Sequence, residues 1–107
     1  MRRRLEIRPR AAIDLLDHAA YIALDSEDAS ERLLDAVERA FQRLLDVPEA
    51  GALRDRPNRQ LAGLRMWPVP EFRNYLIYYC AADSGVEIVR VLHAAQDGSR
   101  ELHGEGP

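Results

Sequence analysis

The segment from Leu64 to Gln96, LRMWPVPEFRNYLIYYCAADSGVEIVRVLHAAQ, decides the fold. It contains three apolar runs rich in residues that favour β-strands, at positions 64–69, 72–80 and 86–94. The last two runs are separated by a short loop that ends in Gly85, which is typical of a β-hairpin. Pro70 marks the break before the second run, because proline cannot donate to a central ladder. We therefore predict an antiparallel sheet, one face of which is covered by the residues upstream.

Composition predicts a single domain that covers residues 1–107, with flexible ends at 1–3 and 98–107. The chain is 47% hydrophobic and 31% charged, as in globular proteins, and no apolar run has the length of a membrane span. The basic start has no apolar segment behind it, so we expect no signal peptide. The single cysteine, Cys80, is expected to be a buried, inert thiol and fits a reducing cytoplasm.

Charge is distributed unevenly along the chain, although the net charge is only −3. All fifteen basic residues are arginines; residues 1–10 carry a net charge of +4, and residues 14–46 carry −6. The span from Arg54 to His93 is mildly basic, at +2. The expected helical half is therefore acidic and suits a basic partner.

Upstream of the sheet, the pattern predicts an edge strand at Leu5–Ile7 and then two helices. Pro9 suits the first turn of the first helix, whose apolar residues recur at 12, 15, 16, 19, 22 and 23. The second helix, with Asp28 and Glu31 spaced as a capping pair at its start, has an apolar stripe that ends before Pro48: Leu33, Val37, Ala40, Phe41 and Leu44. The two helices should form an antiparallel hairpin against the sheet. Aspartate at Leu16 or Val37 should therefore unfold the protein.

The sequence contains no motif that indicates a metal site, a phosphate-binding loop or a catalytic nucleophile. The three histidines, His18, His93 and His103, have no neighbouring ligands at metal-binding spacing. There is no glycine-rich phosphate loop, no nucleophile-elbow motif and no paired cysteine motif. We therefore expect no metal, no cofactor and no catalytic residues.

The arginines of the sheet half allow two interpretations. Arg54, Arg56 and Arg59 precede the sheet, whereas Arg65, Arg73 and Arg90 lie on or beside strands. With simple alternation, Arg90 shares a face with Ile88 and Leu92, while His93 shares the other with Val89 and Val91. Arg90 could pair with a carboxylate at the rim of the sheet, or belong to a partly basic surface that contacts phosphate or an acidic partner.

Six motifs follow one another between residues 4 and 97: Pro9–Leu15, Tyr21–Ala23, Phe41–Pro48 followed by Gly51, Leu61–Arg65, Tyr75–Tyr79 and Val86–His93. Together they resemble the RelE/ParE superfamily of bacterial type II toxins, on the ParE side. The resemblance implies an α+β fold of order β-α-α-β-β-β, with a two-helix hairpin packed on an antiparallel sheet. It also implies a ParD-like, ribbon-helix-helix antitoxin, with operator DNA contacted only through that antitoxin. The candidate antitoxin-binding residues are Leu16, Ala20, Tyr21, Leu24, Tyr75 and Tyr79.

The resemblance leaves two activities open: inhibition of DNA gyrase by binding, and RelE-like cleavage of mRNA on the ribosome. The nuclease branch uses lysines, a strand arginine and a C-terminal tyrosine or histidine. This chain has no lysine and no tyrosine after Tyr79, so we favour gyrase inhibition. A toxin fold whose toxicity has decayed is a third possibility. Candidate target-binding residues are Arg65, Arg73, Arg90, His93, Gln96 and Asp97. Deletion of residues 97–107 should reduce toxicity more than stability.

Overall fold

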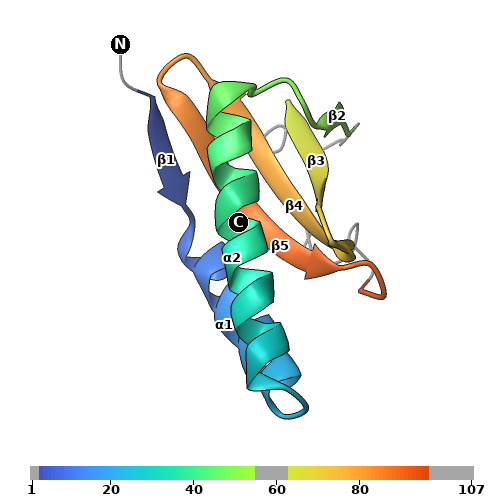
Figure 1. The fold of residues 1–107 in the computed structure, drawn as a ribbon. Coiled ribbons are helices and arrows are strands. Elements are labelled where there is room, and N and C mark those ends of the chain that lie inside the picture. Colours follow the sequence, from blue (N-terminus) through green and yellow to red (C-terminus); the bar gives the residue numbers. More distant parts are fainter. Residues whose placement is uncertain (1–2, 55–62, 97–107) are drawn as a thin grey trace.

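Two helices cover one face of a five-stranded sheet in the computed structural model, which describes residues 3–54 and 63–96 (Figure 1). The elements follow the chain as β1 (Arg4–Ile7), α1 (Pro9–Ala23), α2 (Glu27–Asp46), β2 (Ala52–Leu53), β3 (Leu64–Val69), β4 (Phe72–Ala82) and β5 (Gly85–His93). Their order in the sheet is β1-β5-β4-β3-β2. The α+β class and all three strands of the 64–96 segment are confirmed.

The sheet is mixed, because one of its pairings is parallel. β3–β4 and β4–β5 are antiparallel, as expected, but β1 lies at the edge and runs parallel to β5. A parallel pair needs a long connection, and the helices, β2, β3 and β4 supply it between β1 and β5. The sequence pattern does not predict the two residues of β2, since so short a strand leaves no alternating pattern.

β1 approaches β5 closely at Gly85. This residue has a φ of 151°, which L side chains rarely adopt, and a Cβ placed there would overlap the backbone carbonyl oxygen of Arg4. Only glycine allows the two strands to pair at this point. Hydrogen bonds from the N–H of Arg4 to the Ser84 oxygen and from the N–H of Arg8 to the Ile88 oxygen mark the two ends of the pairing.

The helix α2 has the amphipathic pattern that its sequence predicts. Its expected apolar stripe is buried, together with Ala36. The start of the helix differs from the expectation: Ser26, rather than Asp28, is the N-cap residue, and its Oγ accepts a hydrogen bond from the N–H of Ala29 at 3.1 Å. Serine stabilises a helix start because it satisfies a backbone donor that has no partner within the helix.

The helix α1 is rotated from the orientation that its apolar spacing predicts. Leu16 belongs to the expected buried stripe, but its side chain is 71% exposed. Ala11 and Asp14 are buried instead, and the imidazole of His18 bonds to β5. The apolar pattern predicts the wrong face of α1 because two polar residues, Asp14 and His18, face the sheet. The expectation that Leu16→Asp unfolds the protein is therefore wrong.

A β-bulge interrupts the simple alternation that the sequence predicts for β5. Tyr78 pairs with Arg90 but Tyr79 pairs with Ile88, so Val89 is an extra residue in the ladder. As a result, Ile88 and Val91 belong to the cluster that packs under the helices, whereas Val89 and Leu92 belong to a second cluster that contains no helix residue. The expectation that Val89 and Val91 share a face is wrong for this reason.

Candidate functional site

The surface of α1 that points away from the sheet is apolar. We call Ile13, Leu16, Ala20, Tyr21 and Leu24 the α1 outer face; all five are exposed. The side chains of Leu16, Tyr21 and Leu24 are 71%, 75% and 86% exposed. Four of the sequence-predicted antitoxin-binding residues therefore lie together. Large apolar side chains gathered on one exposed surface are a common feature of protein interaction sites.

A hollow of about 440 Å³ continues this face at the junction of the two helices. It is lined by Tyr21, Ile22, Leu24, Asp25, Ser26 and Ala29. Asp17 on α1 and Asp25 in the turn after it are exposed, so the apolar surface carries negative charge at its border.

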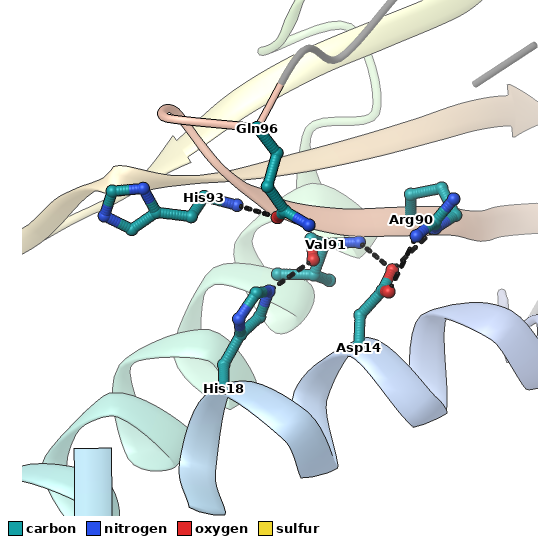
Figure 2. A network of polar contacts seen from close by, with 6 residues as sticks. All are labelled: Asp14, His18, Arg90, Val91, His93 and Gln96. Carbon is teal, nitrogen blue, oxygen red and sulfur yellow. Dashed lines mark hydrogen bonds and ion pairs between the residues drawn. The ribbon is translucent and has the colours of Figure 1, made fainter. Parts of the chain in front are cut away.

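The opposite surface of α1 carries a buried ion pair (Figure 2). Asp14 accepts hydrogen bonds from Nε and Nη2 of Arg90 at 2.7 and 2.9 Å. Arg90 is 2% exposed and Asp14 is 6% exposed. The pairing with a carboxylate is thus confirmed, but it lies in the interior and not at the rim of the sheet. Because its guanidinium is buried, Arg90 does not belong to a basic surface, which was the other of the two interpretations.

Side chains of α1 also close the free edge of β5. The ladder with β1 ends at Ile88, so no strand among the described residues pairs with the backbone of Val91 on that side. The N–H of Val91 donates to Asp14 Oδ2 at 3.0 Å, and its carbonyl oxygen accepts from His18 Nε2 at 2.8 Å (Figure 2). Exposed strand edges invite pairing with other chains, and here two polar side chains occupy the edge instead.

Two predicted site residues, His93 and Gln96, meet in the turn that follows β5. Gln96 Oε1 accepts from the N–H of His93 at 2.8 Å, and the N–H of Gln96 donates to the His93 carbonyl oxygen at 2.9 Å (Figure 2). The N–H of Ala95 donates to His93 Nδ1 at 2.9 Å. These contacts hold His93 as part of the turn.

An aromatic contact connects this turn with α1. The ring of Tyr75 lies between the rings of His18 and His93, edge to face, with centroids 5.0 Å apart in both pairs. Burial raises the pKa of Tyr75, and the nearby phenol of Tyr21 raises this pKa further. Tyr75, which was predicted to bind the antitoxin, is half-buried in this contact.

Tyr79 was predicted to bind the antitoxin, but its side chain is completely buried. Its hydroxyl donates to the Pro48 carbonyl oxygen at 2.7 Å and accepts from the N–H of Gly51 at 2.8 Å. Burial raises its pKa, against the lowering effect of the hydrogen bond from Gly51 and of the Arg65 charge. A partner cannot reach Tyr79 on this surface, so its assignment to the antitoxin-binding set is wrong.

The remaining predicted arginines do not form one basic surface. Nη1 of Arg65 donates to the Gly51 carbonyl oxygen at 2.8 Å, which anchors the chain after α2. Arg73 is exposed near the start of β4. Asp97, Arg56, Arg59 and His103 lie outside the described residues, as do the proposed deletion of 97–107 and most of the expected flexible ends.

Within residues 3–54 and 63–96, no three His, Cys, Asp or Glu side chains are placed to hold a metal ion. Neither helix combines the length and the hydropathy of a membrane span in that part of the chain. Cys80 is half-buried, and burial raises its pKa, which disfavours the reactive thiolate.

The sequence interpretation missed Ile13 and the buried role of Asp14. Ile13, Leu16, Ala20 and Leu24 follow the spacing i, i+3, i+7, i+11, which is a second apolar stripe on α1. A helix with two apolar stripes presents one of them to solvent or to a partner. The need of Arg90 for a carboxylate could have identified an acid in α1, but not which one.

Comparison with known proteins places the chain in one family. The family described as the ParE toxin of the type II toxin–antitoxin system, parDE, matches residues 5–98. The sequence has no match among curated proteins. A solved structure described as the chromosomal ParDE TA system from P. aeruginosa has the same fold, with a TM-score of 0.67 at 17% identity. The alignment covers 86% of this chain and 96% of that chain.

Proposed function

The chain belongs to the ParE toxin family of type II toxin–antitoxin systems, and we propose that it acts by binding and not by catalysis, with DNA gyrase as its target and a ParD-like antitoxin as its inhibitor. The observation that carries the proposal is the α1 outer face, where three large apolar side chains are exposed on a well-formed helix. An apolar surface of this kind gains stability when a partner covers it.

The antitoxin segment that fits this face is an amphipathic helix with basic flanks. Its apolar side chains would cover Leu16, Tyr21 and Leu24 and fill the hollow beside Ser26. Lysines or arginines beside them would meet the net charge of −6 in residues 14–46. The ribbon-helix-helix part of such an antitoxin would contact operator DNA, and the toxin would contact DNA only through it.

Three of the groups that ribonuclease chemistry could use are engaged in other contacts among the described residues. Cleavage needs a base, an acid and cations that hold the phosphate. The Nδ1 lone pair of His93 accepts a backbone hydrogen bond, Arg90 is buried with Asp14, and Arg65 binds a backbone carbonyl. A net charge of −3 is also unfavourable for binding RNA. These features favour gyrase inhibition over cleavage of mRNA.

A supercoiling assay with purified gyrase tests the proposal directly. We expect the purified chain to reduce supercoiling and to leave transcripts intact in a translating extract, with both effects measured at matched toxin concentrations. Cleaved transcripts with unaffected gyrase would contradict the proposal. Normal growth on expression without antitoxin, with neither effect in vitro, would identify a toxin fold that has lost its toxicity.

A further inference from the structure

β1 is the outermost strand of the sheet, and within residues 3–54 and 63–96 no strand pairs with its outer side. The N–H groups of Arg4 and Arg8 bond to β5. Because backbone groups alternate in direction along a strand, those of Leu5 and Ile7 point away from the sheet. Ile7 is also one of the exposed large apolar residues. This edge is therefore open to another strand.

Two charged side chains on β1 lack ion-pair partners among the described residues. Arg4 and Glu6 are both exposed. Glu6 lies directly opposite Glu87 in the parallel ladder, and Glu87 is already bound by Arg8 at 3.0 and 3.2 Å. Like charges placed opposite each other destabilise a sheet. A cation supplied at Glu6 from outside the molecule would remove this unfavourable contact.

We propose that β1 of a second copy of this chain binds this edge, antiparallel, about a two-fold axis that passes through Leu5. In this register Arg4 of each copy lies opposite Glu6 of the other, and Arg3 lies opposite Ile7. The interface therefore contains two identical pairs of opposite charge, each between Arg4 of one copy and Glu6 of the other. A two-fold axis at Glu6 would instead bring two glutamates together, and a parallel arrangement would oppose arginine to arginine.

Backbone geometry agrees with the same register. Leu5 and Ile7 have outward-pointing N–H and C=O groups, and an antiparallel pair centred on Leu5 makes about six backbone hydrogen bonds from residues of this parity. Charged residues on an edge strand usually prevent association. Here the order arginine, leucine, glutamate makes the edge self-complementary.

The dimer is expected to be weak and to depend on concentration, because a four-residue strand buries much less than a standard interface of about 1,600 Å². None of its residues belongs to the α1 outer face. The dimer can therefore form or be absent whether or not the proposed function is correct.

Sedimentation analysis of the purified full chain, from micromolar to millimolar concentration, tests this proposal through a charge-swap series. Glu6→Arg or Arg4→Glu alone should weaken dimerisation by about tenfold or more, because two attractive pairs become repulsive. The double variant Arg4→Glu/Glu6→Arg should recover most of the loss. Arg73→Glu, which makes the same charge change on β4, is the control and should dimerise like the wild type.

A second variant tests the backbone bonds. Ile7→Pro removes an outward N–H and is expected to abolish dimerisation, whereas Ile7→Ala keeps that N–H and should dimerise more strongly than Ile7→Pro. If Ile7→Pro fails to fold in a thermal melt, the charge-swap series decides alone. A wild type that stays monomeric at millimolar concentration, or a dimer unaffected by both single charge changes, would overturn the proposal.

Discussion

The two helices of this protein use their faces in opposite ways. α2 buries apolar residues such as Leu33 and Phe41 and presents charged residues to solvent, as a helix on a sheet normally does. α1 buries the carboxylate of Asp14 and exposes Leu16 and Leu24. A helix that departs from the pattern of its own fold is the place where function is expected. This difference is the basis of our proposal that α2 serves stability and α1 serves partner binding.

The buried face of α1 is stable because its polar groups are satisfied. The Asp14 carboxylate accepts three hydrogen bonds, two from Arg90 and one from the N–H of Val91. A buried charge is tolerated only when it is paired and fully hydrogen-bonded. The pair fixes the rotation of α1 about its axis, and this rotation turns the apolar stripe outward.

The largest effect is expected for Val37→Asp, which places an unpaired charge in the core under α2. We expect a loss of about 4 kcal/mol or more in the free energy of unfolding, measured by urea denaturation. Leu34→Asp is the matched control, because Leu34 is an exposed leucine on the same helix. Equal stability of the two variants would show that the buried face of α2 is wrongly assigned.

The second-largest loss of stability is expected when one partner of the buried ion pair is removed. Asp14→Leu leaves the Arg90 guanidinium without its carboxylate and should cost about 3–5 kcal/mol of stability. The double variant Asp14→Leu/Arg90→Met should recover much of this loss, since no charge then remains buried. Asp28→Leu, which breaks the exposed pair with Arg32, should change stability by less than about 1 kcal/mol.

At the C-terminal end of α2, the Tyr79 hydroxyl bonds to the chain that leaves the helix. Removing this hydroxyl tests the structural role of Tyr79. Tyr79→Phe leaves the buried N–H of Gly51 without an acceptor and should cost about 1–3 kcal/mol in a urea melt. Tyr21→Phe removes a hydroxyl from the exposed α1 outer face and should cost little. A reversed order would contradict the structural role of Tyr79.

A smaller effect is expected from pH, because burial raises the pKa of Tyr79 above its ordinary value of 10.0. The folded protein therefore favours the neutral phenol, whereas the unfolded chain ionises near the ordinary value. The contribution of Tyr79 to stability is fully present below pH 10 and is lost as the pH rises above it. Thermal melts between pH 8 and pH 11 should show a weaker alkaline decline for Tyr79→Phe than for the wild type.

Local pattern was sufficient for the strands and for α2, because there the buried residues are the apolar ones. The stripe from Leu33 to Leu44 follows this rule, and the 64–96 segment follows it except at the buried Arg90. The orientation of α1 could not be predicted in this way, since its deciding contact joins Asp14 to Arg90, 76 residues away. Hydrophobic periodicity carries no information on such a pair.

The candidate site was predicted in part for the same reason. Leu16, Ala20, Tyr21 and Leu24 were named from the family resemblance, and the structure brings them together on one face. Arg90 and Tyr79 were misplaced, because a bulge and a buried hydroxyl network depend on tertiary contacts. The parallel pairing of β1 likewise depends on Gly85, which tolerates the close backbone.

The double variant Leu16→Asp/Leu24→Asp tests the central claim most directly. Its free energy of unfolding and its affinity for the proposed ParD-like antitoxin would be measured on the same preparation. We predict stability within about 1 kcal/mol of the wild type and an affinity lower by about a hundredfold. An unfolded variant, or a folded variant with unchanged antitoxin affinity, would contradict the assignment of partner binding to the outer face of α1.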